Sequence, residues 1–122
     1  MALRYLLDEH FRGDIWQAIL HHNAQSLDTI DVVRVGDPPD LPLSTPDSDI
    51  LVWSEQAGRV LISRDRRTMI AELVAHLQAG RTCPGLFMVR PRSRLADVLA
   101  FLVEAASAGD EDQWRDQATY IP

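Results

Sequence analysis

The chain has 122 residues, of which 46% are apolar and 25% charged, a balance typical of a globular protein of one domain. Its formal net charge is −6, and all twelve basic residues are arginine, which excludes a Walker-type phosphate loop and Schiff-base chemistry because both need a lysine. The single cysteine, Cys83, excludes an internal disulfide and a cysteine-rich zinc site, and no apolar run reaches the roughly 20 residues of a membrane span.

The first half of the chain alternates strand-like and helix-like patterns. The short apolar run 3–7 predicts a buried strand, and apolar residues at helical spacing over 13–22 predict an amphipathic helix. Alternating apolar and polar residues over 29–35 predict a second strand. Four prolines exclude regular structure over 36–46, and a helix is expected directly after this loop, through residue 56.

The second half repeats the alternation. Residues 59–63 predict a third strand, and 68–79 predict a helix that Gly80 ends. A fourth apolar strand over 85–89 precedes a last helix over 95–106.

The order of these elements predicts the fold class. Strands that alternate with helices indicate a parallel sheet covered on both faces. We therefore expect an α/β protein with three layers, α/β/α, around a central, mostly parallel sheet of four or five strands. The whole chain, 1–122, is expected to form one domain, and the polar tail 110–122, which contains Trp114, Tyr120 and Ile121, is expected either to dock back on it or to add an edge strand.

Acidic residues follow two predicted strands and open one helix. Asp8 and Glu9 close the first strand, Asp65 closes the third, and Asp47 and Asp49 lie at the start of the middle helix. Groups at the carboxyl ends of parallel strands meet in one crevice, where ligands bind. Crowded carboxylates repel one another unless a cation lies between them, and hard oxygen ligands suit Mg²⁺ or Mn²⁺. The pattern therefore indicates a metal-dependent phosphodiester enzyme.

Each of these acids also has a structural interpretation. Asp8 is a good N-cap for the first helix, and Asp65 is able to start the turn after its strand. Asp47, taken singly, is favoured by the dipole of a helix that Thr45 would cap, and Asp49 has the same explanation. Convergence of all of them on one crevice is what favours the functional interpretation.

Two stretches of the sequence resemble the small PIN-like proteins, which are relatives of PIN-domain ribonucleases and of toxins from toxin–antitoxin pairs. The first is Leu-Leu-Asp-Glu around Asp8, and the second runs from Asp47 through Ser-Arg-Asp at Asp65. The late strand Pro-Gly-Leu-Phe-Met-Val-Arg, ending at Arg90, is also similar, so the resemblance covers nearly the whole chain. After Ser-Arg-Asp the family often has a second Asp and a Phe, whereas this chain has Arg66-Arg67-Thr68-Met69.

The resemblance implies a PIN-like fold and a Mg²⁺- or Mn²⁺-dependent endoribonuclease. Asp8, Asp47 and Asp65 would be the metal ligands, with Glu9 beside them as a catalytic acid. Glu9 or Asp49 would orient the attacking water or hold a second ion. RNA is then the expected substrate, and an antitoxin protein or a second copy of the chain the expected partners. Arginines around the acidic ends, above all Arg64 and Arg90, are suited to bind phosphates.

Two other interpretations of the sequence stay open. One is a non-catalytic PIN-like interaction module, and the other is a Toprim-like site that uses Glu9 with Asp47 and Asp49. Toprim places its acidic pair after a strand, whereas this pair follows the proline-rich loop and opens a helix. The acidic net charge argues at first against nucleic acid, although a bound cation would offset part of it. Without the pattern of a secretion signal, the protein is expected to be cytoplasmic and not to enter a membrane.

Overall fold

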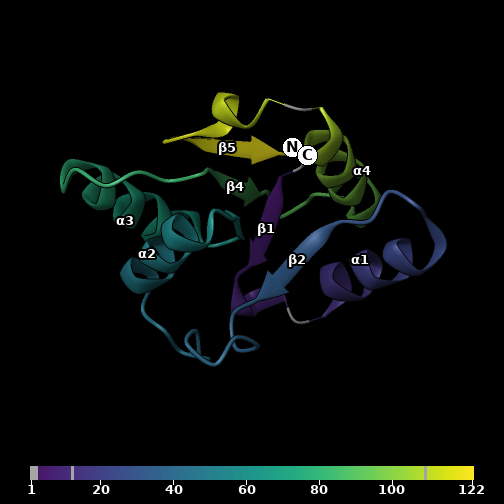
Figure 1. Ribbon diagram of the computed structural model, residues 1–122, viewed down its shortest axis with the longest axis horizontal. Helices are drawn as coiled ribbons and strands as arrows, with labels where there is room; N and C mark the ends of the chain where they lie inside the picture. The colour runs from purple at the N-terminus through teal and green to yellow at the C-terminus, as the bar shows by residue number, and fades with distance from the viewer. Residues whose placement is uncertain (1–2, 12, 109) are drawn as a thin grey trace.

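Five parallel strands of four residues each form the centre of the computed structural model, which describes residues 3–11, 13–108 and 110–122 (Figure 1). The strand order in the sheet is 2-1-3-4-5, one of the common orders of doubly wound α/β folds. Along the sheet the strands are β2 (Asp31–Arg34), β1 (Arg4–Leu7), β3 (Val60–Ser63), β4 (Leu86–Val89) and β5 (Ala118–Ile121).

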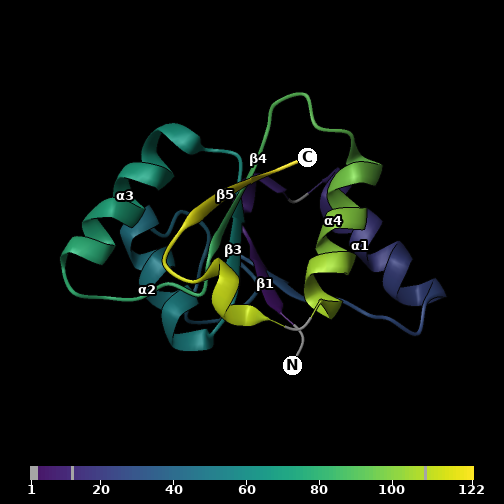
Figure 2. The ribbon, with the colours of Figure 1, turned by 90° about the horizontal axis from the view of Figure 1, so that it is seen from above.

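Helices cover both faces of this sheet. Figure 2 shows α1 and α4 on one side and α2 and α3 on the other, which confirms the predicted α/β class with three layers. Two short 3-10 helices, η1 and η2, follow β1 and precede β5. The helices are α1 (Asp14–Gln25), α2 (Asp47–Ala57), α3 (Arg66–Gln78), α4 (Leu95–Ser107), η1 (Glu9–Phe11) and η2 (Glu111–Trp114).

Two apolar cores, one on each face of the sheet, hold the layers together. Alternate strand residues point to opposite faces, so Tyr5 and Phe87 enter the core under α1 and α4, whereas Leu6 and Met88 enter the core under α2 and α3. Because both faces are covered, β3 and β4 are buried along their whole length. This explains why their sequences read as continuous apolar runs without alternation.

The starts of α2 and α3 differ from the sequence prediction in how they are capped. α3 begins at Arg66, two residues before the predicted Thr68, because the Asp65 side chain caps it. The side chain of Thr45 does not cap α2; its hydroxyl donates to the Pro42 carbonyl instead (2.6 Å). Pro46 is therefore the N-cap residue of α2. No side-chain cap accepts a hydrogen bond from the first backbone amides of this helix.

The polar tail is docked, as predicted. Its strand β5 pairs with β4, and Trp114 packs edge-on against Phe87, with ring centroids 5.0 Å apart. Asp116 binds Cys83 in both directions: its carboxylate accepts from the Cys83 amide (2.7 Å), and its own amide donates to the Cys83 carbonyl (2.8 Å). Cys83 is buried, and its burial raises the pKa of the thiol to about 11, so this side chain packs as a neutral thiol.

Within the described part of the chain, no helix combines the length and the apolar character that crossing a membrane requires.

Candidate functional site

The acidic residues that the sequence singled out lie at the carboxyl edge of the sheet. In the order 2-1-3-4-5 the chain leaves β1 and β3 toward opposite faces, and ligands of open α/β sheets bind outside the carboxyl ends at such a point. Asp8 directly follows β1, and Asp65 comes two residues after the end of β3. Asp47 opens α2 and reaches the same edge, as its contact with Thr68 shows.

Asp8 is the most buried of these acids, with 3% of its surface exposed. Burial raises the pKa of its carboxyl above the ordinary value, while hydrogen bonds from Ser63 and from the Glu9 amide act in the opposite direction. Those bonds measure 3.0 Å from the Ser63 hydroxyl and 2.7 Å from the Glu9 amide. The interpretation of Asp8 as a cap of α1 is wrong, because α1 begins after Gly13 without any side-chain cap.

Asp47 and Asp65 share one hydroxyl group. The Thr68 hydroxyl oxygen lies 2.7 Å from a carboxylate oxygen of Asp65 and 3.0 Å from one of Asp47. The Thr68 amide also donates to Asp65, at 3.2 Å, and these bonds lower the pKa of the Asp65 carboxyl. A hydroxyl carries a single proton, so it cannot give both carboxylates a full hydrogen bond. The pair therefore keeps unused acceptor capacity that a cation would satisfy.

Ser63 joins the third carboxylate to this pair. Its hydroxyl donates to Asp8 and accepts from the Asp65 amide (3.1 Å). Asp8, Ser63, Asp65, Thr68 and Asp47 thus form one continuous chain of hydrogen bonds, which we call the acidic network.

The sequence interpretation gave no role to Ser63 or Thr68. Thr68 stands three residues after Asp65, which is the spacing at which an N-cap side chain accepts a hydrogen bond from a backbone amide. This spacing is the sequence feature that indicates a contact between the two residues. His10 was missed as well. It lies near enough to both Asp8 and Asp65 to lower their pKa values by electrostatic attraction, although it is a smaller influence than the hydrogen bonds.

The oxygen ligands of the acidic network suit a divalent ion that keeps several of its waters better than an ion that is surrounded by protein groups alone. Among the residues that the structure describes, no three side chains of His, Cys, Asp or Glu lie close enough together to hold an ion. Asp47 and Asp65 meet at Thr68, while Asp8 lies on the far side of Ser63 and uses both of its oxygens in hydrogen bonds. Mg²⁺ keeps several waters and needs only one or two protein carboxylates, so this pair fits it.

The other two predicted acids lie outside the acidic network. Glu9 accepts from the amide of Ser44 (3.0 Å), a residue in the left-handed region at φ 67°, and so holds the proline-rich loop against η1. Asp49 is exposed and lines a separate groove of ≈490 Å³ between that loop and α2, beside Trp53. Asp47 and Asp49 open α2 after a loop, as the sequence indicated, which keeps the Toprim-like arrangement disfavoured.

The two predicted phosphate-binding arginines are exposed and rest on aromatic rings. The Arg64 guanidinium lies 4.7 Å from the centre of the Phe11 ring and 3.9 Å from the Asp14 carboxylate. Arg90 lies 5.4 Å from the centre of the Tyr120 ring. Stacking on a ring restricts a guanidinium without occupying its N–H donors, so both arginines remain able to bind an anion.

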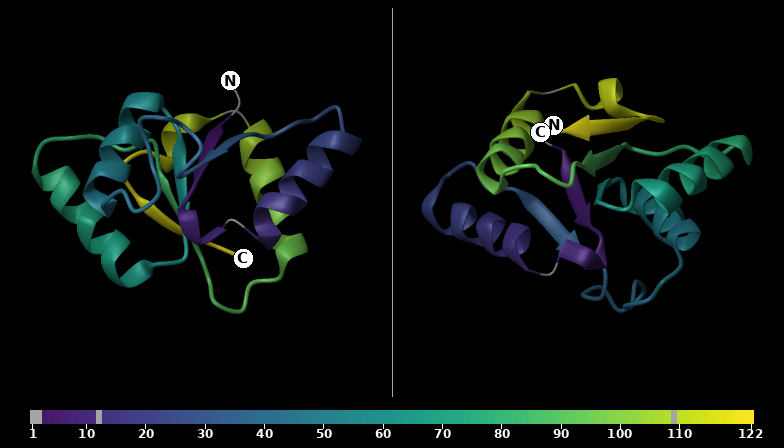
Figure 3. Two further views of the ribbon diagram at one scale, coloured as in Figure 1. Left: turned by 90° about the horizontal axis from the view of Figure 1, so that it is seen from below. Right: turned by 180° about the vertical axis from the view of Figure 1, so that it is seen from behind.

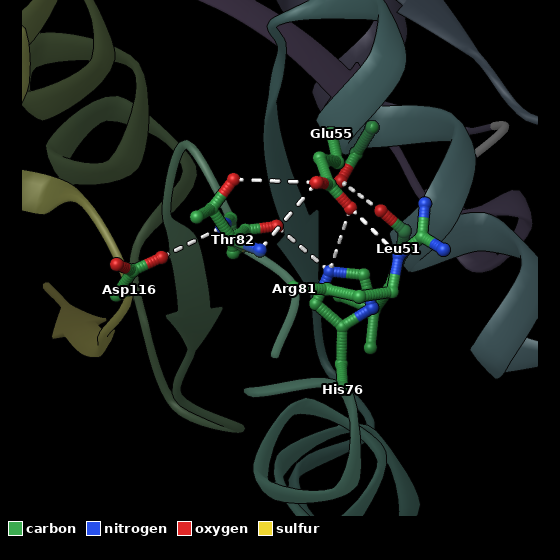
Figure 4. A network of polar contacts seen from close by, with 8 residues as sticks. Leu51, Glu55, His76, Arg81, Thr82 and Asp116 are labelled. Atoms are coloured by element: carbon green, nitrogen blue, oxygen red, sulfur yellow. Dashed lines mark hydrogen bonds and ion pairs between the residues drawn. The ribbon is translucent and has the colours of Figure 1, made fainter. Parts of the chain in front are cut away.

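A second polar cluster lies at the opposite, amino edge of the sheet (Figure 4). Glu55 accepts from Arg81 (2.9 Å), which holds the pKa of the glutamate below its ordinary value, and it lies 3.3 Å from His76. His76 in turn donates to the Thr82 carbonyl (2.7 Å). A cavity of ≈1190 Å³ also opens at this edge, lined partly by Glu55. Because these polar groups bind one another, the cluster fixes the end of α3 and offers fewer free groups than the acidic network.

Removal of the Asp8 charge is expected to change how stability depends on pH. Burial raises the pKa of this carboxyl in the folded state, so its contribution to the free energy of unfolding is fully present below the unfolded pKa and is lost as pH rises through the folded one. Asp8→Asn should therefore gain stability relative to the wild type as pH rises from 4 to 7. Urea unfolding of both proteins across this pH range measures the difference between their free energies of unfolding. A difference that does not change with pH would contradict the destabilising effect of the buried Asp8 charge.

Comparison of the chain with models of protein families, with curated proteins and with solved structures finds no match.

Proposed function

We propose that the protein is a Mg²⁺- or Mn²⁺-dependent ribonuclease of the PIN-like type. The observation that carries the proposal is the Thr68 hydroxyl held between the carboxylates of Asp65, which follows β3, and Asp47, which opens α2 at the same edge of the sheet. Such a pair of incompletely bonded carboxylates, at the position where open α/β sheets bind ligands, is an arrangement that a divalent cation stabilises.

Each residue of the acidic network has a distinct role in this proposal. Asp47 and Asp65 would hold the ion, and Asp8, buried behind Ser63, would complete the site through a water. When bound, the ion supplies a Lewis acid for the phosphoryl oxygen and lowers the pKa of a water that attacks the phosphodiester. Thr68 fixes the spacing between the two carboxylates, and Glu9 fixes the loop beside them.

Arg64 and Arg90 would bind phosphates next to the scissile bond. Both extend from the carboxyl ends of strands that flank the acidic network, β3 and β4, and both rest on aromatic rings. Their planar donor pairs match the geometry of a phosphate. Arg90→Ala should therefore weaken substrate binding and reduce its dependence on salt, with a smaller effect on the chemical step.

The biological setting that fits such an enzyme is the toxin of a toxin–antitoxin pair in the cytoplasm. RNA would be its substrate, and an antitoxin protein or a second copy of the chain its partner. A neighbouring reading frame that encodes a small DNA-binding protein would support this role.

Hydrolysis of single-stranded RNA tests the proposed function directly. The purified protein should cleave a labelled RNA in millimolar Mg²⁺ or Mn²⁺ and stop on addition of EDTA, because the ion generates the nucleophile. Asp47→Asn should abolish cleavage, whereas Asp28→Asn, a matched loss of one exposed charge between α1 and β2, should not. A protein that cleaves no RNA in Mn²⁺ but binds another protein tightly would favour the non-catalytic interaction module.

A further inference from the structure

Most of the arginines gather at one edge of the sheet. Seven of the twelve lie at the carboxyl end of β2, β3 or β4 or within five residues after it. By contrast, the arginines at the amino edge are bound to protein oxygens. The seven are Arg34, Arg64, Arg66, Arg67, Arg90, Arg92 and Arg94; those at the amino edge are Arg4 with the Ala57 carbonyl, Arg59 with Asp31, Arg81 with Glu55 and Arg115 with Asp112.

Four arginines at the carboxyl edge have no partner among the residues that the structure describes. Arg66, Arg67, Arg92 and Arg94 are exposed, and within residues 3–11, 13–108 and 110–122 none of their guanidinium groups makes a hydrogen bond or ion pair. Acidic residues are not scarce, since the chain has 18 of them against 12 arginines. These guanidinium groups are therefore available to an external anion.

The register of the sheet brings these arginines together. Ser63 pairs with Met88, so the residues after β3 leave the sheet beside those after β4, at the spacing of neighbouring strands, about 4.8 Å. Figure 3 (left) shows the start of α3, the loop between β4 and α4, and the C-terminus along the same edge. Arg66 and Arg67 thus leave this edge toward α3, on one face of the sheet, whereas Arg90 and the two arginines that follow it leave the same edge toward α4, on the other face. A nucleic-acid strand that lies across this edge passes both groups.

An exposed aromatic ring completes this surface. Tyr120 on β5 pairs in register with Met88, is 42% exposed, and carries the Arg90 guanidinium at 5.4 Å from its ring centre. Proteins that bind single-stranded nucleic acid combine a basic surface for the backbone with aromatic rings on which bases stack. Exposed Tyr120, with the Arg90 guanidinium over its ring and further arginines at the same edge of the sheet, is that combination.

The other side of the acidic network has the opposite charge. The loop after β2 contributes Asp37 and Asp40, and Asp49 lies next to it on α2. Arg34, at the end of β2, is engaged by Asp37 at 2.7 Å and by the Trp16 ring at 4.2 Å. A polyanion is therefore attracted to the side of β4 and β5 and repelled from the side of β2.

We propose that Arg66, Arg67, Arg90, Arg92, Arg94 and Tyr120 form an arginine strip that binds a single nucleic-acid strand on one side of the acidic network, without a metal ion. The proposal rests on the proposed function for the identity of that strand as RNA. Single strands suit the strip better than duplexes, because only unpaired bases are free to stack on the Tyr120 ring.

Binding of a fluorescent twelve-nucleotide oligouridylate in EDTA, measured by anisotropy at several salt concentrations, tests the strip. Each phosphate contact contributes about 0.7 to the slope of log affinity against log salt for a single strand. Arg66→Ala and Arg92→Ala should each lower the slope by about that amount. Arg115→Ala, the matched loss of an exposed arginine at the opposite edge, should leave it unchanged. Tyr120→Leu should weaken binding at least about fivefold through lost stacking.

The outcomes separate this proposal from the proposed function. A protein that binds the oligonucleotide with these effects but cleaves nothing in Mn²⁺ would support the strip and contradict the ribonuclease. A protein that cleaves RNA while Arg66→Ala and Arg92→Ala bind as the wild type does would overturn the strip alone. The strip is also overturned if the protein binds no RNA in EDTA, which is the result expected of a surface that binds an acidic protein instead. It is overturned as well if Arg115→Ala weakens binding as much as Arg66→Ala and Arg92→Ala do.

Discussion

Asp65→Asn should abolish RNA hydrolysis and leave the melting temperature unchanged or slightly lower, whereas Asp65→Ala should lose both activity and stability. Asp65 has two roles that these substitutions separate: its carboxylate faces Asp47 across Thr68, and it caps α3 through the Thr68 amide. Asparagine is as good an N-cap as aspartate, so the cap survives while the charge is lost. Alanine removes both, at a cost of about 1 kcal/mol for the cap.

The measurement pairs a thermal melt without metal with the RNA cleavage assay. Repulsion from Asp47 disappears in Asp65→Asn, which offsets the lost hydrogen bonding of the charged form. For Asp65→Ala, about 1 kcal/mol corresponds to a drop of roughly 4 °C in a domain of this size. If Asp65→Asn melted as early as Asp65→Ala, the charge itself would be needed for the fold. If it retained full hydrolysis, Asp65 would not be a metal ligand.

The sequence predicted the layered fold because its apolar patterns are strong and local. β3 and β4 are continuous apolar runs buried on both faces, and Gly58, the C-cap of α2 at φ 68°, has the left-handed conformation that commonly ends a helix. The strand order and the parallel pairing of β5 were beyond the pattern alone, since they depend on contacts between distant residues. Trp114, wedged against Phe87 and Phe101, provides the contact that docks the tail.

Helix starts were predicted less well because a polar side chain near a helix start has more than one backbone group to bind. Thr45 has the preferred type for an N-cap, but its hydroxyl turns back to the Pro42 carbonyl inside the proline-rich loop. Asp65 was predicted to be a metal ligand or to start a turn, with the helix beginning at Thr68, whereas its side chain caps α3. A short polar side chain near a helix start has several backbone partners within reach, and tertiary geometry selects among them.

The sequence predicted the acidic residues of the candidate site but not the hydrogen bonds that connect them. The sequence placed Asp8 and Asp65 after predicted strands, and the structure, in which those strands are neighbours, joins both with Asp47 in the acidic network. The joining groups, Ser63 and Thr68, are common residues without a distinctive pattern. Glu9 was predicted beside the acids, and its bond to Ser44 depends on a loop conformation that no sequence pattern specifies.

Gly85→Ala should destabilise the protein by about 3–5 kcal/mol, a large part of the 5–15 kcal/mol that stabilises a typical domain. Gly85 has φ +148°, a region that side chains rarely adopt, at a cost of about 1–3 kcal/mol. A Cβ there would also lie 2.9 Å from the Trp114 carbonyl oxygen and 3.1 Å from its Cβ. Overpacking of this kind adds about 1–3 kcal/mol.

Gly80→Ala is the control that separates these two causes. Gly80 also has a positive φ, +82°, but an added Cβ would meet nothing within 4 Å, so only the backbone cost of about 1–2 kcal/mol should remain. Urea unfolding of both variants measures the difference. The clash at Gly85 cannot be relieved by a side-chain rotation, because the obstructing atom is backbone and the same segment bonds Asp116 to Cys83. Equal losses in the two variants would show that the tail shifts freely, and the docking of β5 would then contribute little to stability.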